Sequence, residues 1–271
     1  MNKNSITTYF VESTVEKRIV LLSDIHYYNK KNISLLKNIQ TKVLKINPDF
    51  ICIPGDFIDE RIIYDKEYLL EFFTNLGMIC PVIISLGNHE AKTRNDDMNK
   101  FDNKLLNSIK SIDNVYLLNN ESWICDNIRF TGLTLPYLAY MERKDSYEYV
   151  LETLNKYFSN GQENDKYNII LSHSPYTLLY ESVRNHPFYK SSDLILSGHT
   201  HGGLTPKWIC CLIKRSLITP LRHLFPKNSY GYLKEEKTII SSGITKLSHF
   251  NPFRILNFLF KGEIVVIELK K

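Results

Sequence analysis

The chain has 271 residues, of which 43% are hydrophobic and 23% are charged, and its formal net charge is +5 at pH 7. These values are ordinary for a globular protein and exclude a long disordered segment, and no stretch reaches the ~20 apolar residues that a membrane-spanning helix needs. The length predicts one large domain over residues 1–271 rather than two. The first ten residues lack the apolar segment of a secretory signal, so we expect a cytoplasmic location.

The first part of the chain alternates apolar segments with amphipathic ones. Short apolar segments predict buried strands at 17–23, 50–54 and 81–85. Helical spacing of apolar residues predicts helices at 32–46, 65–76 and about 98–112. This order predicts right-handed crossovers and a parallel sheet, in which ligands collect beyond the carboxyl ends of the strands.

The rest of the chain is richer in strands. Predicted strands lie at 115–118, 123–125, 128–133, 167–172, 193–196, 230–234, 237–242 and 263–269, and one further helix is predicted at 145–158. The turn Asp126-Asn127 predicts a hairpin, and so does the pair of strands between 230 and 242. We therefore expect a second sheet packed on the first.

Side chains suited to metal binding follow these apolar segments directly. They are Asp24, His26, Asp56, Asn88, His89, His173, His199 and His201. Five of the eight histidines of the chain belong to this set. Histidines packed in a core would explain one or two of the five, but not all of them at strand ends. The pattern predicts a metal site.

The ligand types narrow the choice of metal. Carboxylates, imidazoles and an amide oxygen without thiolates favour Mn2+ or Fe2+, with Zn2+ as an alternative. Even seven of these eight side chains are too many ligands for one tetrahedral ion. They suit two divalent ions about 3.5–4 Å apart that share a bridging carboxylate.

Five short motifs occur in a fixed order between about residues 18 and 203. They are Asp24-x-His26, Gly55-Asp56-x-x-Asp59, Gly87-Asn88-His89-Glu90, the lone His173, and Gly198-His199-x-His201. Together they resemble the signature of the calcineurin-like metallophosphoesterases. The resemblance implies an α/β fold, a four-layer α/β/β/α sandwich with two mixed sheets.

The resemblance also implies a role for each matching residue. The implied ligands of the first ion are Asp24, His26 and His201. Those of the second ion are Asn88, His173 and His199. Asp56 would bridge the two ions. The implied reaction is attack on phosphorus by a metal-bridging hydroxide, with the ions neutralising charge on the phosphoryl and leaving oxygens.

Three further residues carry secondary assignments. His89 matches the family's histidine that is not a ligand but contacts the substrate and protonates the leaving group; a packing role is the alternative. Asp59 resembles the carboxylate that holds this histidine, and it also suits a helix N-cap. We assign Glu90 a structural role.

The wider pattern resembles the small bacterial phosphodiesterases of the YkuE-like subgroup, which are often attached to membranes. The matching features are Leu224-Phe225-Pro226 to Gly231-Tyr232, Ser242-Gly243 and the strand at 263–267. Two features of the subgroup are missing: the N-terminal anchor and the Arg-x-Asn-x-Pro-Glu turn. The second motif also lacks the Asp-Arg-Gly expected of a Ser/Thr protein phosphatase.

Positive charge is concentrated in the last quarter of the chain. Residues 204–271 carry 12 Lys and Arg against 4 Asp and Glu. Two loops at about 207–225 and 249–261 are both apolar and basic. We favour the interpretation that their side chains pack over the second sheet; the alternative is peripheral contact with the inner face of a membrane. Nucleic-acid binding is disfavoured, because the basic residues form neither a helical stripe nor a known module. The oligomeric state is not predicted.

The five cysteines lack the spacing of a zinc site, and Cys52 and Cys125 lie in apolar segments. This pattern predicts buried free thiols.

The function predicted overall is metal-dependent hydrolysis of a phosphodiester or pyrophosphate-type bond, in a small molecule or a lipid-linked substrate. A phosphomonoesterase and a metal-retaining, non-catalytic scaffold are the alternatives.

Overall fold

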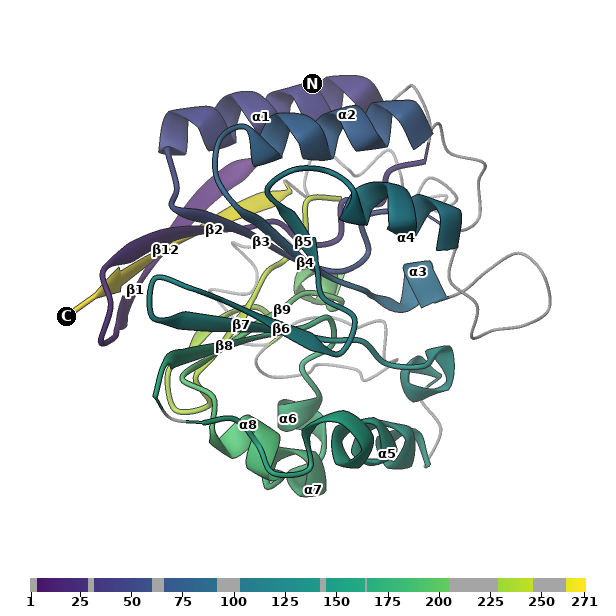
Figure 1. The fold of residues 1–271 in the computed structure, drawn as a ribbon, viewed down its shortest axis with the longest axis vertical. Helices are drawn as coiled ribbons and strands as arrows, with labels where there is room; N and C mark the ends of the chain where they lie inside the picture. The colour runs from purple at the N-terminus through teal and green to yellow at the C-terminus, as the bar shows by residue number, and fades with distance from the viewer. Residues whose placement is uncertain are drawn as a thin grey trace.

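The computed structural model describes residues 4–28, 32–59, 66–91, 103–141, 145–163, 165–204, 229–245 and 262–271. Within this part, two six-stranded sheets stack face to face and helices cover both outer faces (Figure 1). Both sheets are mixed. The predicted four-layer α/β/β/α sandwich is therefore confirmed.

The first sheet has the strand order β1-β12-β2-β3-β4-β5. Its strands are β1 (Ser5–Glu12), β2 (Lys17–Leu21), β3 (Phe50–Pro54), β4 (Val82–Ser85), β5 (Val115–Leu117) and β12 (Glu263–Lys270). Strands β2 to β5 run parallel, whereas β12 is antiparallel to β2 and parallel to β1. Because β2, β3 and β4 are parallel, the first three motifs, which follow these strands, lie at one edge of the sheet.

Three helices cover the outer face of this sheet: α1 (Ile33–Ile46), α2 (Lys66–Gly77) and α4 (Asn103–Lys110). Each presents one apolar stripe to the sheet, as Leu36, Ile39 and Val43 do in α1. Of the helix predicted at 98–112, the structure describes the α4 portion. A fourth, single-turn helix, α3 (Asn88–Ala91), follows β4 directly.

The second sheet has the order β10-β11-β9-β8-β7-β6. Its strands are β6 (Glu121–Cys125), β7 (Ile128–Leu133), β8 (Tyr167–Ser172), β9 (Leu194–Ser197), β10 (Gly231–Leu233) and β11 (Thr238–Ile240). Strands β7, β8, β9 and β11 are parallel, and each edge strand pairs antiparallel. Both predicted hairpins, β6-β7 and β10-β11, are present.

The outer face of the second sheet packs against one long helix, α5 (Ser146–Phe158), and several short helical elements. The short elements are the 3-10 helix η2 (Tyr137–Tyr140), α6 (Tyr176–Leu179), α7 (Glu181–Arg184) and α8 (Pro187–Lys190). A further 3-10 turn, η3 (His201–Leu204), follows β9. Between the sheets, side chains such as Phe50, Phe130 and Leu196 form a continuous apolar layer. Burial on both faces explains why the central strands are apolar throughout.

The edge strand β1 and the short helical elements of the fold were not predicted. β1 lies at the edge of its sheet and mostly alternates half-buried with exposed residues, and its polar residues leave no continuous apolar segment. The helices α6 to α8 have four residues each, too few to show a helical period. The two predicted basic loops, at 207–225 and 249–261, lie outside the described residues.

Candidate metal centre

All the site residues predicted from the sequence lie beyond the carboxyl ends of parallel strands, at one edge of the sandwich. From the first sheet come Asp24 and His26 after β2, Asp56 and Asp59 after β3, and Asn88 and His89 after β4. From the second come His173 after β8, and His199 and His201 after β9. The stacking of the sheets brings the two sets together.

One group of potential ligands consists of Asp24, His26 and His201, whose ligand atoms lie within 4.8 Å of one another. Asp24 Oδ1 is 3.9 Å from His26 Nε2 and 3.6 Å from His201 Nε2. His201 Nδ1 donates a hydrogen bond to the carbonyl oxygen of Thr245 at 2.9 Å. This bond fixes the ring and leaves Nε2 as the acceptor nitrogen that faces Asp24, as a metal ligand requires.

A second group consists of Asp56, His173 and His199. His173 Nε2 lies 3.0 Å from Asp56 Oδ2 and 3.2 Å from His199 Nδ1. Asn88 Oδ1 is 3.1 Å from the same His173 nitrogen. His173 Nδ1 bonds to the carbonyl oxygen of Pro54 at 2.9 Å, so backbone again directs Nε2 into the group.

Asp56 lies between the two groups. Besides its contact with His173, its Oδ2 is 3.9 Å from His26 Nε2 and 3.8 Å from His89 Nε2, and these three side chains form a third set of potential ligands within 4.8 Å of one another. The carboxylate therefore reaches residues of both groups, which is the placement that a bridging ligand needs.

The backbone at this edge is strained. Positive φ angles between 48° and 68° occur at five of the seven predicted ligands: Asp24, His26, Asp56, His199 and His201. Such a conformation costs roughly 1–3 kcal/mol for each non-glycine residue and persists where function requires it. Strain at so many adjacent positions is typical of a functional site.

Some of these side chains also have buried polar atoms without a hydrogen-bond partner, as is expected of residues that bind a cation. Both ring nitrogens of His26 are buried, and neither has a hydrogen-bond partner among the described residues. Leaving buried polar atoms unpaired costs about 1–3 kcal/mol each, and a metal ion would satisfy them. The oxygen and nitrogen donors of both groups suit a divalent ion of the Mn2+, Fe2+ or Zn2+ type.

Burial and the charges of neighbouring side chains determine the protonation states of His26, Asp56 and His173. Burial, then the neighbouring His89, lowers the pKa of His26 well below its usual value, so the ring is neutral and keeps a lone pair. Burial favours the protonated form of Asp56, but His173 and His89 hold its pKa well below the usual range. Burial lowers the pKa of His173, but Asp56 outweighs it and raises the value to about 9. Asp56 is therefore ionised, as a cation ligand should be.

His89 lies beside Asp56 and Asp59, and its side chain is 16% exposed. Its Nδ1 is 3.9 Å from Asp59 Oδ1, and its ring meets that of His26 edge to face at 4.5 Å. Asp59 itself is fully buried. The arrangement places the predicted proton donor, His89, beside the carboxylate that was predicted to hold it.

Glu90 ties two of the ligand-bearing loops together. Its buried carboxylate accepts hydrogen bonds from the backbone N–H groups of Asp56 at 2.9 Å, Ile58 at 3.1 Å and Gly87 at 2.7 Å. Burial and the charge of Asp56 raise its pKa to about 7 against these bonds. The structural role assigned from the sequence agrees with these contacts.

Sequence reasoning missed Tyr140, at the end of η2. Its ring lies 5.6 Å from that of His199 and 6.0 Å from that of His173, measured between centroids. Burial, then the charges of Asp56 and Glu90, raises the pKa of its phenol well above the usual value. Tyr140 follows no predicted strand, so no sequence signal pointed to it.

The sequence profile of the calcineurin-like phosphoesterases matches residues 17–203, more than half of the chain and the whole span of the five motifs. The chain belongs to this family. Members are metal-dependent phosphoester hydrolases, and the clusters at the strand ends provide the candidate metal-binding residues. The family assignment does not extend to the YkuE-like subgroup, which stays a prediction.

Two curated relatives illustrate the similarity. An uncharacterized metallophosphoesterase of Campylobacter jejuni is 28% identical over 254 residues, which are 93% of this chain and 59% of the relative. The UDP-2,3-diacylglucosamine pyrophosphatase LpxG of Chlamydia trachomatis is 24% identical over 215 residues, 68% of this chain and 63% of the relative. The chain thus spans about three-fifths of the length of these two relatives.

Among solved structures, a protein of Thermus thermophilus aligns with a TM-score of 0.44 at 12% identity, covering 69% of this chain and 83% of that one. None of the helices in the described part of the chain has the length and hydrophobicity that crossing a bilayer requires.

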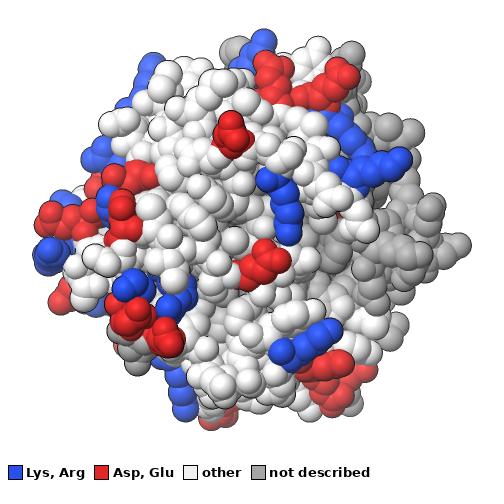
Figure 2. Space-filling model, in the orientation of Figure 1, with Lys and Arg blue, Asp and Glu red and all other residues white. Residues whose placement is uncertain are grey.

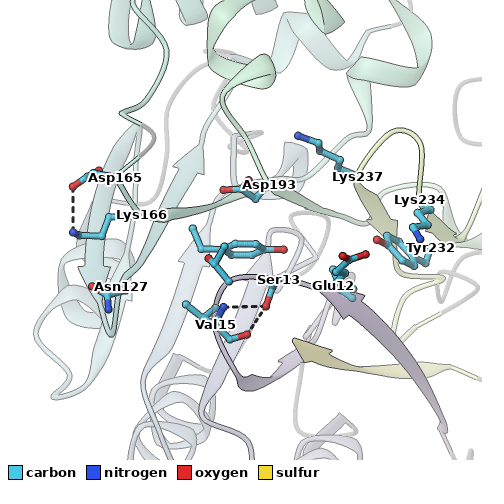
Figure 3. Close-up of a pocket in the computed structure, with 13 residues that line it drawn as sticks. Glu12, Ser13, Val15, Asn127, Asp165, Lys166, Asp193, Tyr232, Lys234 and Lys237 are labelled. Carbon is cyan, nitrogen blue, oxygen red and sulfur yellow. Dashed lines mark hydrogen bonds and ion pairs between the residues drawn. The ribbon is translucent and has the colours of Figure 1, made fainter. Parts of the chain in front are cut away.

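A groove of about 910 Å³ lies at the opposite end of the strands from the metal ligands (Figure 3). It is lined by residues at the starts of strands, such as Asn127 before β7, Tyr167 at the start of β8 and Asp193 before β9, and by Lys234 and Lys237 of the β10-β11 hairpin. None of the predicted ligands lines it.

On the face in Figure 2, acidic and basic side chains of the described residues are interspersed rather than separated by sign.

Proposed function

We propose that the chain hydrolyses a phosphodiester or pyrophosphate-type bond at a dinuclear metal centre. The observation that carries the proposal is the pair of ligand groups that meet at Asp56. Asp24, His26 and His201 would hold one ion; Asn88, His173 and His199 would hold the other. When bound, the two ions would supply an activated water nucleophile and neutralise charge on the phosphoryl group.

His89 is the proposed proton donor to the leaving oxygen. It is more exposed than His173 or His26 and lies next to both ligand groups. Asp59, 3.9 Å from His89 Nδ1, would orient the imidazole and favour its charged form. His89 would hand its proton to the departing oxygen, and solvent would restore the proton.

The proposal is tested with two chromogenic substrates. Chelator-treated protein is expected to be inert toward bis-p-nitrophenyl phosphate, and Mn2+ is expected to restore hydrolysis. Faster turnover of p-nitrophenyl phosphate than of the diester would favour the alternative of a phosphomonoesterase. A metal-replete chain that cleaves neither compound would favour the other alternative, a non-catalytic scaffold.

A lipid-linked substrate is part of the proposal. The support is the similarity to LpxG, the pyrophosphatase of an acylated sugar nucleotide. The test compares hydrolysis of a diacylated UDP-sugar with that of the same UDP-sugar without acyl chains, and a preference for the acylated compound is expected. Equal rates on the two would contradict a lipid-linked substrate but not phosphoester hydrolysis.

The cytoplasmic location and the contact with the inner face of a membrane stay predictions. Cosedimentation with anionic vesicles at low and high salt tests the membrane contact, which predicts binding that weakens as salt rises. Absence of binding at both salt concentrations would exclude it.

A further inference from the structure

The hydroxyl of Tyr140 is buried and has no hydrogen-bond partner among the described residues. Its two neighbours in the same apolar cluster differ in this respect. Tyr176 donates to the carbonyl oxygen of Ala139 at 2.8 Å, and Tyr189 shares a hydrogen bond with Ser172 at 3.3 Å. Because an unmet buried hydroxyl destabilises the fold, this one calls for an explanation that packing alone does not provide.

The position of Tyr140 supplies that explanation. Its ring packs against those of His199 and His173, which belong to one ligand group. His173 in turn lies 3.0 Å from Asp56, measured from Nε2 to Oδ2, at the same edge of the sandwich. The ring that carries the unpaired donor therefore packs against the residues at which the proposed function requires the phosphoryl group.

We propose that Tyr140 binds the substrate, its hydroxyl donating a hydrogen bond to a non-bridging oxygen of the phosphoryl group. The inference rests on the proposed function and adds a binding residue that lies outside the five motifs. A neutral donor at this point orients the phosphoryl group without adding another charge. The ring meanwhile packs in the apolar cluster behind the second sheet, which keeps the hydroxyl in place.

The test is a matched pair of variants that each remove one hydroxyl and keep the ring. Tyr140→Phe is expected to lower kcat/KM by about 10-fold to 100-fold, since a hydrogen bond to a charged oxygen is lost. Its melting temperature should not fall, because the removed group is unpaired in the free protein. Tyr176→Phe should show the reverse: a melting temperature lower by about 2–6 °C and kcat/KM within 2-fold of wild type.

Binding of inorganic phosphate separates this inference from the proposed function. Calorimetry on Mn2+-loaded protein should show about 10-fold weaker phosphate binding by Tyr140→Phe than by wild type, at equal metal content. This readout holds even if no substrate is cleaved, in which case the proposed function alone fails. Equal phosphate affinity of the two proteins, or a wild type that binds no phosphate, would overturn the role of Tyr140. A melting temperature that falls in Tyr140→Phe without a change in phosphate affinity would reduce the residue to packing.

Discussion

His173 and Asp56 join the two sheets at the metal centre, with His173 Nε2 3.0 Å from Asp56 Oδ2. His173 follows β8 of the second sheet and Asp56 follows β3 of the first. The other nitrogen of His173 bonds to the carbonyl oxygen of Pro54, the last residue of β3. One side chain thus links the two sheets and directs a nitrogen toward the proposed bridging carboxylate.

Glu90→Gln tests whether the brace between the ligand-bearing loops matters for metal binding. The amide keeps one acceptor oxygen but turns an NH2 group toward backbone N–H donors, so a loss of about 1–3 kcal/mol in the free energy of unfolding is expected. Weaker Mn2+ binding should accompany it, measured by titration. Glu121→Gln, which changes a 57% exposed carboxylate on β6, is the control and should change neither quantity. Unchanged Mn2+ affinity in Glu90→Gln would show that the brace serves folding alone.

Gly87→Ala tests the close approach of backbone to the bridging carboxylate. A Cβ at this position would collide with the side chain and backbone nitrogen of Asp56 and come 3.0 Å from the His173 ring. We expect lower metal content, and a loss of activity that added Mn2+ does not restore. Gly161→Ala, at φ +73° and outside the ligand groups, should lower the melting temperature but leave metal content unchanged. Full metal content in Gly87→Ala would refute the steric argument.

His89→Ala tests the assignment of the proton donor. Removing a general acid typically lowers turnover by about 10²–10⁴-fold, while the metal ligands remain. The measurements are kcat on bis-p-nitrophenyl phosphate and metal content by mass spectrometry. Loss of metal together with activity would instead make His89 a ligand.

The free cysteines permit a test of burial by pH-dependent alkylation. Cys52 and Cys80 are buried; burial raises the pKa of Cys52 well above its usual value and that of Cys80 to about 12. Because the thiolate reacts and a raised pKa keeps the thiol protonated, both should resist iodoacetamide at pH 8 until the chain unfolds. Cys125 is only half-buried, on an edge strand, so the predicted burial of this thiol is wrong, and it should react before Cys52 and Cys80. Peptide mass spectrometry resolves these three of the five cysteines, and rapid native labelling of Cys52 would contradict the packing.

The sequence predicted the central strands and the ligands for the same physical reason. Strands such as β3 and β8 are buried on both faces and are therefore continuously apolar, and in parallel sheets the residues that follow them share one edge. What lay outside this pattern was missed. β1 is a half-exposed edge strand, and Tyr140 follows a loop rather than a strand.

The contacts that orient the ligands could not be predicted either. The carbonyl oxygens of Pro54 and Thr245 fix His173 and His201, but any residue type offers a carbonyl. The approach of Gly87 to Asp56 likewise depends on how two loops meet. Such relationships are properties of the tertiary structure.

Metal stoichiometry tests the central claim most directly. Mn2+-loaded wild type should hold two ions per chain by inductively coupled plasma mass spectrometry. His201→Ala and His199→Ala should each retain one, because the two histidines belong to different ligand groups. A wild type that saturates with a single ion, or variants that both keep two, would contradict a dinuclear centre divided between these residues.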